Sequence, residues 1–191
     1  MNGLMKEGFR EFMSDIMYND APNWKDLVKS YAVVNDTQIK GFFGDYRWLS
    51  NFYPSPVYYE GIKYPSVENA YQAAKLVESE RNKLVNCSAA ESKKLWKNFI
   101  KLNESAKEWD ARKYQVMAGL IFDKFLNNLE LRELLLHTGQ CHLEETNHWH
   151  DNYWGVCVCP RCHVVTEKSE SWRGENNLGY ILMQTRMFWQ R

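Results

Sequence analysis

Glu68 stands where a carboxylate could take part in catalysis. It follows a Pro-containing loop and falls in the first turn of an expected helix. The positive helix end favours the ionised carboxylate, whereas burial among apolar side chains opposes it. Such a group can orient water or stabilise a cationic sugar, although an acidic residue also suits a helix start for purely structural reasons. Its expected neighbours are Trp48, Tyr64, Val67 and Tyr71.

A second acidic residue, Asp151, begins the segment DNYWG, which ends at Gly155. An acidic residue beside Tyr and Trp in a turn could form one wall of a binding site. The alternative is a solvated loop in which Trp154 is anchored in the core.

Three asparagines could hold ribose hydroxyls or a base edge, because the amide both donates and accepts hydrogen bonds. They are Asn51 in SNFYP and Asn176 and Asn177 in GENNLG. Asn is also common in turns, which is the alternative interpretation. The glycines nearby do not form a phosphate-binding loop, since neither GxxxxGK[ST] nor GxGxxG after a strand is present.

Three of the five cysteines, Cys157, Cys159 and Cys162, lie within six residues. Their spacing suits a structural zinc ion, and an odd number of cysteines does not suggest a disulfide framework. Three reduced thiols in a loop are the alternative. The candidates for a fourth ligand are Cys141, His142, His148, His150 and His163.

The elements that must position these residues are mostly helices. Residues 38–59 are rich in aromatic and β-branched residues broken by Gly and Pro, which predicts short strands and loops, with a hairpin turn at Glu60-Gly61. Ser66 is expected to cap a helix over residues 67–77. Further helices are expected over residues 88–94, 95–102, 107–126, 129–136 and 178–189, with a strand over 143–146 and a loop over 154–175.

The pattern therefore predicts an α+β fold that is predominantly helical, with one compact domain over residues 39–191. Residues 1–38 form a separate extension in which two short helices are expected, over residues 7–17 and 24–33.

Composition narrows the functional class. Eight Trp, eleven Tyr and nine Phe in 191 residues suit a pocket that stacks a flat heterocycle. The 24 basic and 24 acidic residues balance, which argues against a protein devoted to gripping a nucleic-acid backbone. No apolar run reaches membrane-spanning length, and the charged N-terminus is unlike a signal peptide, so we expect a cytoplasmic protein without a membrane partner.

Together these segments resemble the NADAR family over about residues 41–186, in the order that the family has them. No single motif is decisive, but their ordered co-occurrence is specific. The matching residues are Trp48-Leu49-Ser50-Asn51-Phe52-Tyr53-Pro54, Ser66-x-Glu68-x-x-Tyr71-Gln72-Ala73-x-Lys75, Trp109 with Arg112 and Met117, Lys124-Phe125, residues 135–139 and 143–145, Asp151-x-Tyr153-Trp154-Gly155, and Asn176 or Asn177 before Leu178-Gly179 and Leu182-Met183-x-x-Arg186.

The resemblance implies hydrolysis of an N-glycosidic bond in a ribosyl compound, with no cofactor required for the chemistry. Family members divide between ribosylaminopyrimidine phosphates of the riboflavin pathway and ADP-ribose attached to a nucleobase, so DNA is a transient substrate in the second case. This chain departs from the shorter family form in its N-terminal extension and in its Cys-rich loop after Trp154-Gly155.

The resemblance also implies a division of roles. Glu68 would stabilise the cationic ribose ring or activate water, and Asp151 would serve as acid or ribose ligand. Aromatic residues would shape the pocket or stack the base, namely Trp48, Tyr71, Trp109 and Trp154. Polar residues would hold hydroxyls or a phosphate, namely Arg47, Asn51, Lys75, Asn176, Asn177 and Arg186.

Two other classes of function remain open at this point. A binding module for ADP-ribose would keep the pocket and lack turnover, but it would not need both carboxylates. A zinc-stapled nucleic-acid adaptor would be expected to carry a net positive charge, which this chain lacks.

Overall fold

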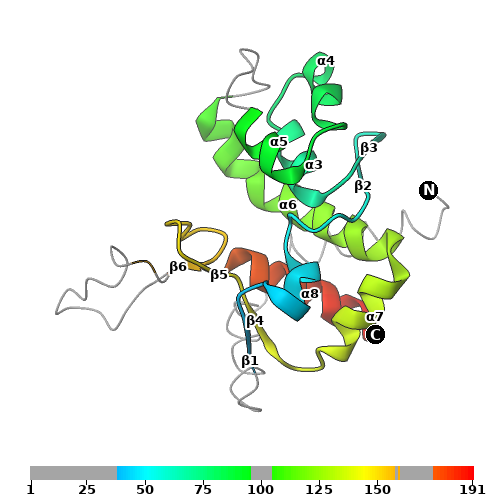
Figure 1. The fold of residues 1–191 in the computed structure, drawn as a ribbon, viewed down its shortest axis with the longest axis vertical. Coiled ribbons are helices and arrows are strands. Elements are labelled where there is room, and N and C mark those ends of the chain that lie inside the picture. Colours follow the sequence, from blue (N-terminus) through cyan, green and yellow to red (C-terminus); the bar gives the residue numbers. More distant parts are fainter. Residues whose placement is uncertain (1–37, 96–104, 158, 160–173) are drawn as a thin grey trace. The chain divides into compact units, whose positions relative to one another are not determined.

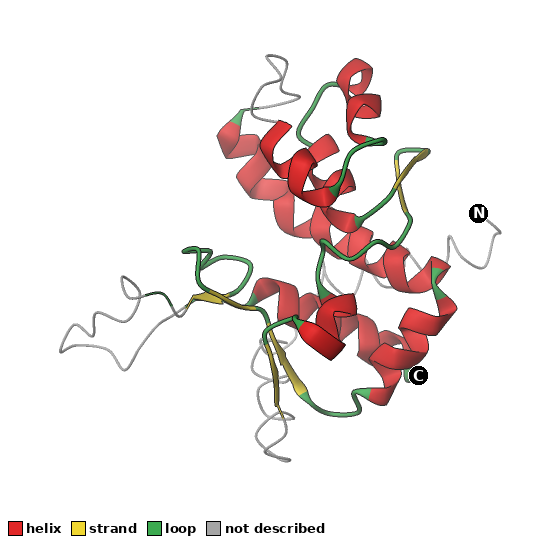
Figure 2. Cartoon of the chain, viewed as in Figure 1, coloured by secondary structure: helices red, strands yellow, loops and turns green. Residues whose placement is uncertain are grey.

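The computed structural model describes residues 38–95, 105–157, 159 and 174–191. Helices predominate and the strands are short, which confirms the predicted α+β class (Figure 2). The helices expected over residues 7–17 and 24–33 lie outside the described residues. Two compact units can be distinguished, residues 51–134 and residues 38–50 with 135–191, counting only described positions.

The first unit opens with the predicted hairpin. Strand β2 (Val57–Tyr59) pairs antiparallel with β3 (Ile62–Tyr64). Glu60 and Gly61 both have positive φ angles, of 45° and 82°. Two consecutive left-handed residues make a turn whose twist matches that of the flanking strands, which is why Gly is favoured there.

Four short helical segments follow the hairpin. Helix α3 (Val67–Ala73) begins where Ser66 accepts a hydrogen bond from the Asn69 N–H, as predicted, but it ends before residue 77. All seven of its residues are buried, so packing rather than an amphipathic pattern holds it. The remaining segments are α4 (Glu78–Arg81), the 3-10 helix η2 (Asn82–Leu84), neither of which was expected, and α5 (Ala89–Leu95), which corresponds to the predicted helix over 88–94.

Helix α6 (Ala106–Asn127) is the longest element, close to the predicted range of 107–126. A reciprocal capping box between Ser105 and Glu108 fixes its first turn. Its buried face includes Met117, Ile121 and Phe125, and it packs against α3 and β2 (Figure 1). Helix α7 (Leu129–His137) follows and ends before Gly139, whose φ of 58° is typical of a helix stop.

The second unit joins two small parallel ladders to one helix. Strand β1 (Gln38–Lys40) pairs with β4 (His142–Glu144), and β5 (Thr146–Asn147) pairs with β6 (Val156–Cys157). The 3-10 helix η1 (Gly44–Leu49) lies where strands and loops were expected. Helix α8 (Asn177–Trp189) packs on β4. Among the described residues, no helix is long and apolar enough to cross a membrane.

Gly179 permits the close approach of α8 to β4. A Cβ atom at this position would lie 2.1 Å from the Leu143 carbonyl oxygen and 2.6 Å from the Asn176 amide atoms. We expect Gly179→Ala to lower the free energy of unfolding by about 3 kcal/mol, since a main-chain atom cannot move aside as a side chain can. Urea unfolding would measure this.

Gly139→Ala is the matched control, because a Cβ there meets no atom within 4 Å. It should cost only about 1–2 kcal/mol for the positive φ angle. Equal losses in the two variants would contradict the close-packing explanation for Gly179.

Candidate active site

Glu68 is held in the first turn of α3 and is 5% exposed. Its N–H donates to the Asn51 carbonyl oxygen at 3.0 Å, which ties the helix start to the preceding loop. Of the neighbours expected for this carboxylate, Tyr64, Val67 and Tyr71 are buried in the same unit.

A chain of hydrogen bonds runs from Glu68 in α3 to Lys75, just beyond the C-terminal end of that helix. The Gln72 Nε2 donates to Glu68 Oε1 at 2.7 Å, and Lys75 Nζ donates to Gln72 Oε1 at 2.8 Å. The spacing of four residues places Glu68 and Gln72 side by side on α3, and Lys75 lies in the turn that follows the helix. Lys75 fixes which end of the amide faces Glu68, so the carboxylate receives an N–H donor.

Two aromatic rings and two cationic side chains lie next to this chain of hydrogen bonds, the Glu68–Gln72–Lys75 relay. The rings of Tyr71 and Trp109 are 5.1 Å apart between centroids, at 60°. Lys75 Nζ lies 4.9 Å from the Tyr71 centroid and 5.5 Å from that of Trp109, and Arg112 Cζ lies 5.1 Å from the Trp109 centroid. Arg112 is fixed by a hydrogen bond of 3.0 Å to the Ala74 carbonyl oxygen. The arrangement combines stacking surface with positive charge.

The Asn51 side chain has a buried hydrogen-bond acceptor that no described residue satisfies, which is rare in folded proteins. Its Nδ2 donates to Met117 Sδ at 3.3 Å, while Oδ1 is buried and has no hydrogen-bond partner among the described residues. A buried acceptor without a donor is costly, and a ligand hydroxyl or N–H would relieve that cost. The first unit thus brings together Asn51, Glu68, Tyr71, Lys75 and Trp109, all of which the sequence singles out.

Asp151 in the second unit caps its own turn. Its Oδ1 accepts from the Trp154 N–H at 2.9 Å and the Tyr153 N–H at 3.3 Å. Asn147, fully buried, binds both the Asp151 N–H and its carbonyl oxygen. The segment DNYWG is therefore a fixed turn rather than a loose loop, and Asp151 is half-buried within it.

The polar residues at the start of α8 mainly bind the main chain. Asn176 accepts from the Glu145 N–H and donates to the Leu143 carbonyl oxygen, both at 2.9 Å. Asn177 donates to the Tyr153 carbonyl oxygen at 2.9 Å and to Glu175 Oε2 at 2.7 Å. These amides position β4 and the DNYWG turn. A role in turns was the alternative to ribose binding that the sequence left open for both asparagines.

Arg186 is likewise used within the second unit. Its guanidinium donates to Thr138 Oγ1 at 2.6 Å and to the Cys141 carbonyl oxygen at 3.0 Å. Burial lowers its pKa to about 10, so it stays charged at neutral pH. Both contacts hold the turn between α7 and β4, which gives Arg186 a structural role.

The remaining predicted residues of the second unit differ in exposure. Arg47 on η1 is exposed, whereas the next residue, Trp48, is buried. Trp154 is half-buried and meets Tyr153 edge to face, with centroids 4.8 Å apart. Of the predicted metal ligands, Cys157 and Cys159 are buried, and Cys162 lies outside the described residues.

Two residues of the first unit were not predicted as site residues, although both belong to the quoted motifs. Gln72 links Glu68 to Lys75, and Arg112 lies on Trp109. The signal for Gln72 was available, because it follows Glu68 by four positions on the same helix and precedes Lys75 by only three.

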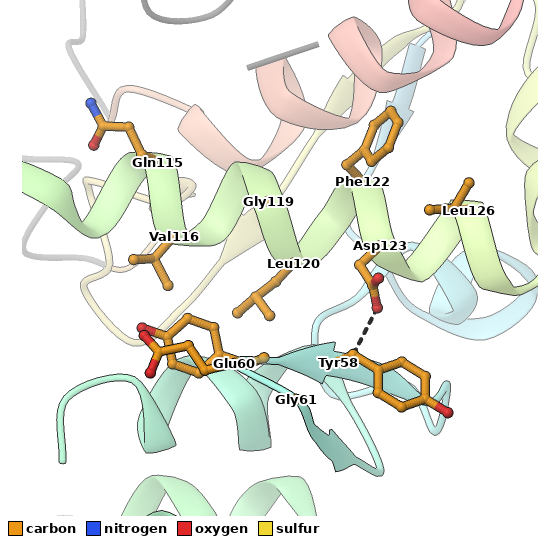
Figure 3. Close-up of a pocket in the computed structure, with 11 residues that line it drawn as sticks. Tyr58, Glu60, Gly61, Gln115, Val116, Gly119, Leu120, Phe122, Asp123 and Leu126 are labelled. Atoms are coloured by element: carbon orange, nitrogen blue, oxygen red, sulfur yellow. Dashed lines mark hydrogen bonds between the residues drawn. The ribbon is translucent and has the colours of Figure 1, made fainter. Parts of the chain in front are cut away.

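A separate cavity of about 370 Å³ lies between the β2–β3 hairpin and α6 (Figure 3). Leu120 and Val116 point from α6 toward the hairpin, and Asp123 Oδ2 accepts from the Tyr58 N–H at 2.7 Å. Burial raises the pKa of Asp123. None of the predicted site residues that the structure describes lines this cavity.

Lys124 is fully buried in the first unit, and its Nζ lies 5.8 Å from the Tyr53 ring centroid and 5.5 Å from that of Phe125. Burial lowers its pKa from 10.5 to about 7. Between these values the unfolded chain binds more protons than the folded chain, so stability contributed by this group rises with pH.

We therefore expect the wild-type protein to gain stability relative to Lys124→Met between pH 7 and pH 9, by about 1 kcal/mol per pH unit. Urea unfolding of both proteins at pH 7, 8 and 9 would measure the difference. Above this window Tyr64, whose pKa burial raises to about 12, works in the opposite direction. Parallel stability curves for the two proteins would contradict the assignment to Lys124.

Comparisons with known proteins agree on one family. A family model described as the NADAR domain matches residues 40–188, which run through both units. The Shigella flexneri protein named N-glycosidase YbiA is 30% identical over 158 residues, 81% of this chain and 89% of that protein. A riboflavin biosynthesis protein of Vibrio vulnificus is 31% identical over 144 residues, 74% of this chain and 35% of that protein. The NMR structure of the E. coli protein YbiA matches with a TM-score of 0.63 at 30% identity, covering 82% of this chain and 87% of that one.

Proposed function

The chain belongs to the NADAR family, and we propose that it is an N-glycosidase that hydrolyses the bond between a ribosyl carbon and the nitrogen of a heterocyclic base. Relatives named N-glycosidase at about 30% identity support the reaction class. The observation that carries the proposal is the buried Glu68, whose carboxylate is oriented by Gln72 and, through it, by Lys75.

The chemistry of the bond explains why a fixed carboxylate matters. As the C–N bond breaks, positive charge develops on the ribose ring and negative charge on the leaving nitrogen. A preorganised carboxylate near the anomeric carbon stabilises the first without moving during the reaction. Glu68 fills this role, either directly or by activating the attacking water, and no cofactor is required.

The residues around Glu68 suit the two ends of a nucleotide-like substrate. Tyr71 and Trp109 offer faces for a flat base, and Lys75 and Arg112 carry the charge that a phosphate needs. The unpaired Oδ1 of Asn51 suits a ribose hydroxyl. Asp151 is the proposed second carboxylate, as acid or ribose ligand, and Arg47, Trp48 and Trp154 are proposed to complete substrate binding.

Two substrate branches fit this chemistry. One is a ribosylaminopyrimidine phosphate of riboflavin biosynthesis, which the name of the Vibrio vulnificus relative favours. The other is ADP-ribose attached to guanine in DNA. A paired assay would separate them: the purified chain is incubated with each compound, and the products are identified by mass spectrometry. Release of the free base from one compound would assign the branch, whereas binding of ADP-ribose without release from either would replace the enzyme with a binding module.

A further inference from the structure

We propose that His150, Cys157 and Cys159 are ligands of a structural zinc ion in the second unit. The ligand atoms of these three residues lie within 4.8 Å of one another. The Cys159 Sγ and the His150 Nδ1 are 4.0 Å apart. In a tetrahedral zinc site, bond lengths of about 2.3 Å to sulfur and 2.0–2.1 Å to nitrogen place ligand atoms roughly 3.5–3.8 Å apart. The three side chains therefore need to close by no more than about 1 Å to bind the ion.

The fold, rather than a local sequence motif, brings the histidine to the cysteines. Strands β5 and β6 pair in parallel so that Asn147 lies opposite Cys157. The Asn147 side chain binds the main chain of Trp149 and Asp151, which fixes the turn between them. His150 lies in that turn with a φ of 69°, a conformation that side-chain-bearing residues rarely adopt. Such a conformation persists only where the surrounding structure holds it, and it often marks a functional position.

The chemical type of the group favours zinc over a hard cation. Two buried thiols and an imidazole are soft ligands that suit zinc, whereas magnesium and calcium prefer oxygen. The Cys159 N–H donates to Cys157 Sγ at 3.4 Å. A main-chain N–H that donates to sulfur stabilises the thiolate form that binds metal, which is the usual arrangement around metal-bound cysteine.

A closed structural site needs a fourth ligand, and the sequence supplies a candidate. Cys162 follows Cys159 at the Cys-x-x-Cys spacing of zinc-binding loops, but it lies outside the described residues and is not assigned as a ligand. Among the candidate ligands that the structure describes, Cys141, His142 and His148 do not belong to the group. Zinc at this position would fasten β6 to the turn that precedes Asp151 and Trp154, without taking part in the reaction.

Metal content of the purified full chain would test this site independently of any enzymatic activity. After reconstitution with zinc and removal of excess metal, we expect one zinc ion per chain in the wild-type protein. Cys157→Ser and Cys159→Ser should each lose it, and His150→Ala should lose it on dialysis against a weak chelator. Cys141→Ser is the matched control, because Cys141 belongs to the same unit but not to the group. Wild-type protein without bound zinc, or equal zinc in Cys157→Ser and Cys141→Ser, would overturn the proposal.

Two measurements on the wild-type chain keep the test decisive if a variant fails to fold. Cobalt in place of zinc should give the near-ultraviolet charge-transfer band of thiolate ligands and the visible bands of tetrahedral coordination. Alkylation followed by peptide mapping should show Cys157 and Cys159 protected with zinc and modified after chelation, while Cys87 reacts alike in both. Absence of the charge-transfer band, or alkylation of Cys157 and Cys159 in the presence of zinc, would show reduced thiols that bind no metal.

Discussion

Glu68→Gln is expected to lower kcat by a factor of about one hundred to ten thousand on the substrate that the wild-type chain cleaves. The substitution keeps the size of the side chain and an acceptor for the Gln72 amide, but it removes the negative charge that would face the ribose ring. Because the loss is confined to the transition state, the Kd of the substrate should change little. Single-turnover rates, substrate titration and the midpoint of thermal unfolding would separate these effects.

Glu78→Gln provides the matched control. Glu78 also lies in the first turn of a helix, α4, but is exposed. The Glu78→Gln variant should retain the wild-type kcat, which would show that a negative charge at a helix start is not sufficient for a role in catalysis. A Glu68→Gln enzyme as fast as the wild type, with the fold intact, would remove Glu68 from the mechanism.

Gln72→Leu should lower kcat by about 10- to 100-fold, the size of effect seen when a partner that orients an active-site ligand is removed. Gln72 is 3% exposed and acts through Glu68, so it is a positioning residue rather than a catalytic one. Leucine fills similar space but breaks both hydrogen bonds of the relay, leaving Glu68 without the Gln72 donor and Lys75 without the Gln72 acceptor. The substrate Kd is expected to stay within a few fold of the wild-type value.

A comparison with other variants distinguishes positioning from general destabilisation. Gln115→Leu on α6 is the control, since the Gln115 Oε1 is buried without a partner in the described part of the chain, so its loss should not affect turnover. Gln72→Met should resemble Gln72→Leu, because it also lacks the amide. Gln72 would be merely structural if Gln72→Leu lowered the unfolding midpoint while the kcat of the folded fraction stayed at the wild-type value.

Local patterns were enough to predict several elements that carry the site. The Glu60-Gly61 turn, the Ser66 cap and α6 are each determined by residues close together in the chain. All residues of α3 are buried, so the sequence has no apolar periodicity that would locate the end of the helix. The predicted end at residue 77 therefore lies beyond the observed end at Ala73. The short helix α4 has a single buried residue, Arg81, so its sequence has no apolar periodicity from which a helix could be predicted.

The roles of polar side chains depended on partners distant in sequence. Asn176 and Arg186 were predicted to bind substrate. In the structure Asn176 binds main-chain groups 31 and 33 residues away, and Arg186 binds the Cys141 carbonyl oxygen and the Thr138 hydroxyl, 45 and 48 residues away. Sequence spacing also could not select His150 as the histidine that joins Cys157 and Cys159, because the selection follows from the pairing of β5 with β6. Gln72 was the exception, since its partners lie only four and three residues away in the chain.

Hydrolysis of both candidate substrates in water labelled with heavy oxygen, followed by mass spectrometry of the sugar and the base, would test the proposed cleavage of the glycosidic bond. Cleavage of the C–N glycosidic bond places one labelled oxygen on the ribosyl product and none on the released base. The unlabelled sugar product, incubated alone in the same water, corrects for exchange at the anomeric carbon. Label on the sugar above that correction, lost in Glu68→Gln, is the predicted result. Label on the base or on a phosphate, or cleavage that persists in Glu68→Gln, would contradict the proposed reaction and the role of Glu68 in it.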